Sequence, residues 1–408
     1  MIRKCSITDA KTFRLHPCCW LVVLGVSLAS RSIAQQPPLD GSEGRSLALD
    51  QFRPQSMLQL DEQRPSRAKF PVVDIHVHLR YKLRQVPEQL DEFVRLMDRQ
   101  NIAVCVSLDG GLGDRLEEHK EFLWKKHRDR FVIFANIDWR GTGQENDPAS
   151  WDCHRPDFGR RMAEALEDAK NRGAVGLKVF KRLGLGYRNP DGTLIAIDDR
   201  RWDPIWEACG RLGMPVLIHT ADPVAFFKPI DRFNERWEEL NRHPEWSFAG
   251  EEFPGHDQLL AARNRVIGRH PQTTFIGAHV ANYPENLAQV GSWLEEYPNL
   301  VVEIAARIAE LGRQPKTARE FFQKYADRIL FGTDGPRPPE RLLPHWRMLE
   351  TDDEYFSYAE GQYPPQGLWN IYGMKLPPDI LQKVYNENAA RSIPGVRERL
   401  ERYRTQSR

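Results

Sequence analysis

Two histidines close an apolar, β-branched run: residues 70–80 read FPVVDIHVHLR. Side chains alternate between the two faces of a strand, so His76 and His78 are expected to point the same way. Two imidazoles on one face at a strand end could bind one metal ion. Two surface histidines on a sheet edge would give the same local pattern, so the rest of the chain has to decide between the two interpretations.

Three further polar residues stand at the ends of later apolar runs. They are His219 in PVLIHT (215–220), His279 in TTFIGAHV (273–280) and Asp334 in RILFGTD (328–334). Buried histidines and carboxylates are costly unless they are paired or coordinated. Imidazoles together with one carboxylate suit a divalent metal ion, with zinc favoured and manganese, iron or cobalt as alternatives. The H-x-H pair alone is a weak signal, whereas the whole series in this order is a strong one.

Eight short β-branched runs must position these residues. The runs cover residues 72–77, 102–108, 131–137, 174–180, 215–220, 273–280, 300–306 and 328–334. Segments of helical period separate most of them, which indicates a parallel sheet covered by helices. Eight strand–helix units predict an α/β fold of the closed (β/α)8 TIM-barrel type. An open, doubly wound sheet is the alternative, and it is disfavoured because no G-x-G-x-x-G follows any of the runs.

Three connections are much longer than the others. They follow the fourth, fifth and eighth strands and cover residues 181–199, 221–256 and 335–378. Long structured loops in a compact domain are usually functional. All three follow the carboxyl ends of strands, where a barrel carries its active site.

The N-terminus differs from the rest of the chain. Basic residues in the first 17 positions precede the apolar run CCWLVVLGVSLA, and Ser32 and Ala34 occupy the small positions of a cleavage site. This pattern predicts a secretory signal peptide over 1–34 and export to the periplasm or medium, with no stable membrane insertion after cleavage. An uncleaved membrane anchor is the alternative. Residues 35–69 are predicted to be a linker or loosely docked arm, and 70–408 the barrel.

The charge and composition of the chain argue against some classes of binding partner. The formal net charge is +1 and 28% of the residues are charged, with the two signs interspersed. No basic stripe or acidic tail is visible, which argues against nucleic acid or an anionic membrane as a partner. A small-molecule substrate is therefore expected.

The pattern resembles the amidohydrolase superfamily, and specifically the amidohydrolase-related branch that includes the aminocarboxymuconate-semialdehyde decarboxylases. The resemblance spans roughly residues 70–393 and rests on VDIHVH (73–78), GLKVF (176–180), LIHTADP (217–223), FIGAHVA (275–281), ILFGTD (329–334) and NENAAR (386–391). It implies that His76, His78, His219 and Asp334 hold one metal ion. It also implies that His279 lies beside the metal as a catalytic group. A homodimer is compatible with the resemblance, because this fold often forms dimers.

Lys178 has two interpretations. Some members of the superfamily carry a carboxylated lysine at this motif, which bridges two metal ions. The other interpretation is a plain ammonium that binds a substrate carboxylate or joins a polar network, and Lys181 competes for this role because it is nearer the strand end. We favour a single metal ion and a substrate-binding or network-binding Lys178.

Several charged residues near strand ends are weaker candidates. Arg307 and Arg337 are predicted to bind a substrate carboxylate, because a guanidinium matches that group in a bidentate manner. Glu303 inside the seventh strand must be paired or face the mouth of the barrel, and Asp74 is expected to orient a ligand from behind.

The chemistry follows from the ligand set. A bound divalent cation lowers the pKa of water and polarises a carbonyl. Asp334 could take the proton of the attacking water, and His279 could shuttle protons. The leading prediction is a hydrolase of a C–N or C–O bond in an amide, lactone or ester. The alternative is a non-oxidative decarboxylase of an aromatic or unsaturated acid, and a third class is a metal- or carbohydrate-binding protein without activity.

Overall fold

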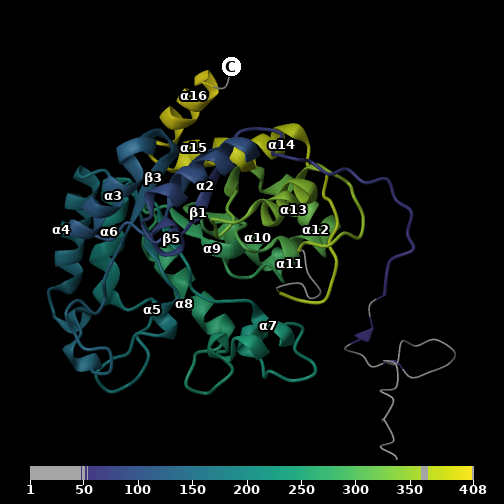
Figure 1. Ribbon diagram of the computed structural model, residues 1–408. Helices are drawn as coiled ribbons and strands as arrows, with labels where there is room; N and C mark the ends of the chain where they lie inside the picture. Colours follow the sequence, from purple (N-terminus) through teal and green to yellow (C-terminus); the bar gives the residue numbers. More distant parts are fainter. Residues whose placement is uncertain (1–46, 48–50, 53, 360–365, 407–408) are drawn as a thin grey trace, which may run out of the picture. The chain divides into compact units, whose positions relative to one another are not determined.

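A computed structural model describes residues 47, 51–52, 54–359 and 366–406. The chain divides into two units, Met1–Gln59 and Leu60–Arg408, and the second contains the whole α/β fold (Figure 1). The predicted signal peptide over 1–34 lies outside the described residues.

Eight parallel strands form a single sheet in the described part of the second unit, and they lie in chain order from β1 to β8. Their bounds are β1 Val72–Val77, β2 Ile102–Ser107, β3 Phe131–Asn136, β4 Gly176–Val179, β5 Val216–Ile218, β6 Phe275–Gly277, β7 Leu300–Glu303 and β8 Ile329–Leu330. The backbone N of Ile75 donates to the carbonyl of Phe331, and Val77 forms a parallel bridge with Gly335. These contacts join the first strand to the last, so the predicted TIM barrel is confirmed.

Apart from β1, the strands are shorter than the apolar runs that predict them. β5 ends at Ile218, β6 at Gly277 and β8 at Leu330. As a result His219 follows β5 directly, His279 is the second residue after β6, and Asp334 is the fourth residue after β8. These three side chains therefore sit on the turns above the barrel, at the carboxyl ends of the strands, where a barrel carries its active site.

Sixteen helices accompany the strands in the described residues. They are α1 Leu79–Lys82, α2 Pro87–Gln100, α3 Asp114–His127, α4 Phe158–Asn171, α5 Arg182–Leu185, α6 Asp203–Leu212, α7 Trp237–Arg242, α8 His256–Arg269, α9 Ala278–Ala281, α10 Leu287–Glu296, α11 Ile308–Gly312, α12 Pro315–Lys324, α13 Pro339–Glu350, α14 Pro378–Gln382, α15 Asn388–Ser392 and α16 Val396–Gln406. Left-handed residues end two of the long ones, Asn101 after α2 and Gly213 after α6. Such residues stop a helix because the chain cannot continue in the right-handed conformation.

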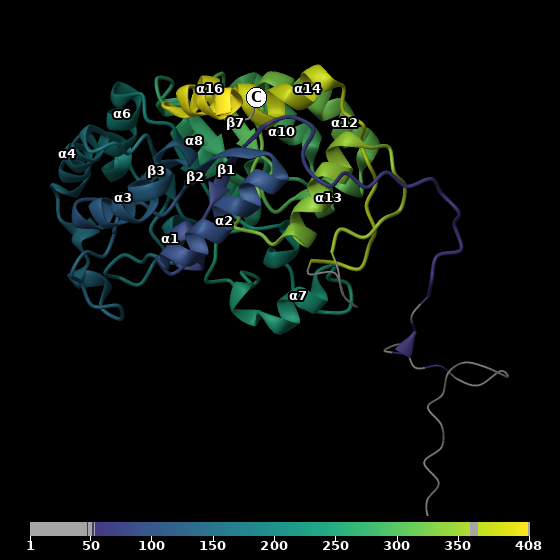
Figure 2. The same cartoon turned by 45° about the horizontal axis from the view of Figure 1, so that its top comes forward.

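The two ends of the barrel are covered differently. Helices α15 and α16 pack their apolar residues against the interior of the strands, and Ile393 and Val396 are buried there. Helix α7 lies at the opposite end, in the long segment after β5 (Figures 1 and 2). The long segment after β8 contains α13. No helix among the described residues is long and apolar enough to cross a membrane.

Part of the expected arm lies against the barrel. The backbone N of Gln63 donates to both carboxylate oxygens of Asp353 at 2.9 Å, and that of Lys69 donates to Glu350 at 2.9 Å. Ala68 is buried. These contacts join residues 60–69 to the segment that contains α13.

Candidate active site

The two histidines of the H-x-H pair are each held from behind by a carboxylate. Nδ1 of His76, at the end of β1, lies 2.9 Å from Oε1 of Glu303, the last residue of β7. Nδ1 of His78 lies 2.7 Å from Oδ1 of Asp109, which follows β2. A carboxylate that accepts from Nδ1 fixes the tautomer of the imidazole and leaves Nε2 with a free lone pair. Both rings are thus prepared to offer Nε2 as a metal ligand.

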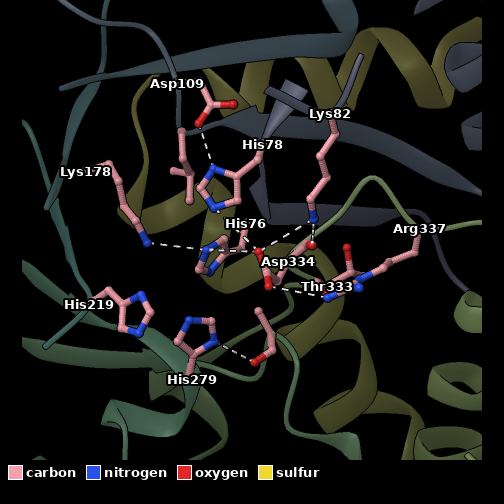
Figure 3. A network of polar contacts seen from close by, with 12 residues as sticks. His76, His78, Lys82, Asp109, Lys178, His219, His279, Thr333, Asp334 and Arg337 are labelled. Carbon is pink, nitrogen blue, oxygen red and sulfur yellow. Dashed lines mark hydrogen bonds and ion pairs between the residues drawn. The ribbon is translucent and has the colours of Figure 1, made fainter. Parts of the chain in front are cut away.

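The two Nε2 atoms face the same carboxylate. Oδ1 of Asp334 lies 3.9 Å from Nε2 of His76 and 3.5 Å from Nε2 of His78 (Figure 3). The backbone N and Oγ1 of Thr333 donate to the carboxylate of Asp74, at 3.1 and 2.5 Å. Asp74 also accepts from the backbone N of His76 at 3.1 Å. Asp74 therefore orients the backbone beneath Asp334 and His76, rather than an imidazole ring.

His219 and His279 complete a cluster of four imidazoles. The ring centroids of His219 and His279 are 4.5 Å apart, and those of His76 and His279 are 4.9 Å apart. Nδ1 of His279 donates to the carbonyl of Ala305 at 2.8 Å, which leaves its Nε2 as the unprotonated nitrogen of the neutral ring. Nε2 of His219 is buried and lies 3.4 Å from Oδ1 of Asp222, although the contact does not have hydrogen-bond geometry.

Burial sets the charge of these groups. Burial lowers the pKa of His76 and His279 well below the usual range, and that of His219 to about 4. Burial alone would raise the pKa of Asp334, but its interactions with His76 and Lys82 hold it at about 2. At neutral pH His76, His219 and His279 are therefore neutral imidazoles, and Asp334 is an ionised carboxylate.

These donors fit a divalent cation, because metal ligands must be neutral imidazoles and ionised carboxylates. Ligand atoms of His76, His78 and Asp334 all lie within 4.8 Å of one another, as do those of His76, His279 and Glu303. The expected ligand His219 lies outside both groups, and its buried Nε2 faces Oδ1 of Asp222 at 3.4 Å. The geometry thus brings three of the four predicted ligands together directly, and the fourth, His219, lies beside His279 with its Nε2 toward Asp222.

Comparison with known proteins shows the family to which the chain belongs. A family model described as amidohydrolase matches residues 73–394, which is most of the chain. The chain belongs to the amidohydrolase family. The match begins at the strand that carries the H-x-H pair and extends beyond Asp334, so it includes every predicted site residue of this chain.

Solved structures with a similar fold include decarboxylases and a dihydroorotase. The 2,6-dihydroxybenzoate decarboxylase from Rhizobium is 17% identical, with 80% of this chain and 98% of that chain covered and a TM-score of 0.46. A dihydroxybenzoic acid decarboxylase from Polaromonas sp. JS666, solved with bound manganese and an inhibitor, is 16% identical, with coverages of 80% and 96% and a TM-score of 0.45. The dihydroorotase from Campylobacter jejuni is 16% identical, with coverages of 81% and 86% and a TM-score of 0.43.

Lys178 lies beside the histidine cluster. Its register neighbours are Asn136 on β3 and Leu217 on β5, so the buried lysine lies between one polar and one apolar residue. Its Nζ lies 3.4 Å from Nε2 of His76, and burial lowers its pKa to about 8. Lys181, the competing candidate, forms an ion pair with Asp222.

A cavity of about 530 Å³ opens above the cluster. His219, His279 and Asp334 line it, as do both predicted carboxylate-binding arginines. The charged residues on its wall are mostly cationic: Lys82, Lys181, Arg236, Arg242, Arg307, Arg337 and Arg341, against Asp222, Glu239 and Asp334. Such a wall favours anionic ligands.

Arg337 and Arg307 differ in the protein groups that they already contact. Nη2 of Arg337 lies 3.4 Å from Oδ2 of Asp334, and its Nε donates to the carbonyl of Thr333 at 3.2 Å. Arg307 follows β7 and donates from Nη1 to the carbonyl of Ala306 at 2.7 Å. Within the described residues it has no carboxylate within 4.0 Å, and its buried Nε has no partner. Arg307 is thus the better prepared of the two to receive a ligand carboxylate.

Two residues of the site were missed by sequence reasoning. Asp109 comes directly after the second apolar run, and its position after a strand end was the available signal. Lys82 donates from Nζ to the carbonyl of Asp334 at 2.5 Å and lines the cavity. It lies in the short helix after β1, four residues beyond His78, where nothing in the sequence separates it from a surface lysine.

Proposed function

We propose that this amidohydrolase is a metal-dependent hydrolase that cleaves a C–N or C–O bond in an amide, lactone or ester of a small, carboxylate-bearing molecule. His76, His78, His219 and Asp334 would hold a single divalent ion, most favourably zinc. The observation that carries the proposal is the convergence of two carboxylate-oriented imidazoles on Asp334 at the base of the cavity.

Each residue has a defined task in this proposal. A divalent cation, when bound, would lower the pKa of water and polarise the substrate carbonyl. Asp334 is ionised and faces the cavity, so its carboxylate can accept the proton of the attacking water. His279 also lines the cavity, and its Nε2 can accept a proton and pass it to the leaving group because Nδ1 is engaged by Ala305.

The cationic wall of the cavity indicates the class of substrate. We assign the substrate carboxylate to Arg307, assisted by Arg337, because a guanidinium without a carboxylate partner gains two charge-assisted hydrogen bonds from that group. Lys178 would act from below the cavity, where its ammonium faces His76. It would stabilise negative charge that develops near the histidine cluster.

A decarboxylase is the second candidate, and Arg307 is the observation that favours it. An arginine on the cavity wall near the proposed metal site could hold the very carboxylate that leaves as CO2. In that case His279 or Asp334 would return a proton to the carbon, and no water would enter the product.

Incubation of the zinc-loaded protein with lactones, amides, esters and aromatic acids in H2¹⁸O tests the two candidates. The proposed hydrolase incorporates one ¹⁸O into the product and loses this activity in Asp334→Asn and with chelator. Release of CO2 without ¹⁸O in the organic product would establish the second candidate instead. The control is Glu295→Gln, because Glu295 lies on the exterior, where it pairs with Lys324.

A further inference from the structure

The turn after β6, which includes the short segment α9 and carries His279, does not have the right-handed backbone of an ordinary helix. Four consecutive residues without the freedom of glycine have positive φ: His279 at 57°, Val280 at 58°, Ala281 at 52° and Asn282 at 58°. The left-handed conformation is unfavourable for residues with a Cβ, and most of all for a β-branched one such as Val280. Such a turn persists only when the surrounding structure holds it.

The turn also packs closely against the strand that precedes it. A Cβ on Gly277, the last residue of β6, would lie 2.9 Å from Cβ of Ala281. Glycine at this position therefore allows the chain to fold back over its own strand, and this fold directs His279 toward His76 and His219 (Figure 3). The direction of the His279 ring depends on the shape of the turn.

Two side chains of α8 hold the carbonyls of this turn. Nη1 of Arg263 donates to the carbonyl of Ala281 at 2.5 Å, and Nε2 of His256 donates to the carbonyl of Asn282 at 3.0 Å. On the other side, Oδ1 of Asn282 accepts from the backbone N of Thr220 at 3.0 Å. The left-handed turn is thus fixed between α8 and the end of β5.

Arg263 is a costly residue to place here. It is fully buried, and no carboxylate among the described residues lies within ion-pair distance of it. Its Nε and Nη2 donate to Oδ1 of Asn264, and its guanidinium lies 4.7 Å from the ring centroid of Trp293. Burial lowers its pKa to about 9, so it is still mostly charged at neutral pH. A buried charge without a counter-charge is destabilising unless it makes strong hydrogen bonds.

We propose that Arg263 is a positioning residue: with His256, it clamps the left-handed turn His279–Asn282 and so fixes the direction in which His279 faces the active site. This inference rests on the proposed function for the role of His279, but the clamp itself is a property of the backbone. The bond to the Ala281 carbonyl is charge-assisted, which makes it the stronger of the two contacts from α8.

Hydrogen–deuterium exchange of the peptide covering 278–283 tests the clamp without any substrate. The amides of Asn282 and Tyr283 donate within the turn, to Ala278 at 2.8 Å and Val280 at 3.1 Å, and report its closure. In Arg263→Leu these amides should exchange about tenfold faster, since one charge-assisted bond is lost. Arg263→Lys should restore much of the protection. The matched control is Arg265→Leu, which removes an exposed arginine of the same helix that pairs with Asp198 at 2.7 Å.

Exchange in Arg263→Leu that equals the Arg265→Leu control would overturn the proposal. If Arg263→Leu does not fold, His256→Phe removes the second contact alone and must accelerate the same amides. With a substrate in hand, Arg263→Leu should lower kcat about tenfold or more at unchanged KM and zinc content. Faster exchange together with a protein that binds zinc but catalyses no reaction would refute the proposed function and leave the clamp intact.

Discussion

Glu303 joins two histidines of the site that come from different strands. Its Oε1 lies 2.9 Å from Nδ1 of His76 and accepts from the backbone N of His279 at 2.7 Å. It is fully buried, and its other oxygen accepts from the backbone N of Ala305. One carboxylate therefore aligns the end of β1 with the turn after β6.

Replacement of Glu303 by glutamine should weaken metal binding. The amide keeps the size of the side chain but replaces one acceptor oxygen by a donating nitrogen, so it no longer fixes His76 in the tautomer that is protonated at Nδ1. We expect zinc affinity to fall by about 10–100-fold, as for other partners of metal-bound histidines. Competition with a chelator of known affinity measures this, with Glu295→Gln as the exterior control. An unchanged affinity would remove Glu303 from the metal site.

Arg307→Met should impair substrate binding more than catalysis. The substitution removes the guanidinium that lacks a carboxylate partner in the described chain, and KM for a carboxylate-bearing substrate should rise about 10–100-fold. Arg313→Met is the control, because Arg313 already pairs with Glu235 at 2.8 Å outside the cavity. An analogue of the substrate without its carboxylate should bind both variants equally. A rise in KM for this analogue as well would indicate a structural role for Arg307.

His345 should make the protein less stable in mild acid. Its ring is buried beside Phe331, and burial lowers its pKa to about 4. The unfolded chain takes up a proton near pH 6.5 and the folded chain only near pH 4, so acid favours unfolding between these values. His345 should therefore cost about 2 kcal/mol of unfolding free energy at pH 5 relative to pH 7.

Urea unfolding of the wild-type protein and His345→Phe, with chelator present, measures this difference. The variant should lose about 2 kcal/mol less than the wild type between pH 7 and pH 5. Parallel pH profiles for the two proteins would show that His345 does not titrate in this way.

The N-terminal sequence predicts that the protein is exported and that residues 1–34 are removed. Expression of the full chain in a host with a secretory pathway should yield a mature protein that begins at Gln35, as measured by N-terminal sequencing or intact mass. A protein that retains residues 1–34 in the membrane fraction would support the uncleaved anchor instead.

The barrel could be predicted because each of its strands has a separate local signal. Continuous β-branched runs such as 72–77 and 131–137 correspond to strands that are buried on both faces. The helix between Pro87 and Gln100 begins at a proline and ends before a left-handed asparagine. The predicted run 273–280 extends beyond the end of β6, and its last two residues begin the left-handed turn. Hydrophobic periodicity does not show where a strand ends and such a turn begins.

The candidate site was only partly visible in the sequence. The order of H-x-H, His219, His279 and Asp334 identified the side chains that meet at the mouth of the barrel. The groups that orient them come from other strands: Asp109 follows β2, and Glu303 ends β7. The register of the closed barrel determines which carboxylate contacts which imidazole, and no local sequence pattern predicts that register.

The metal content of the purified mature protein tests the central claim most directly. Elemental analysis should find about one equivalent of a divalent metal, zinc most favourably, and a marked loss of it in His219→Ala and Asp334→Asn. Two equivalents would instead support a carboxylated Lys178 that bridges two ions. Absence of metal after reconstitution with zinc or manganese, or full retention in both variants, would contradict the proposed metal site.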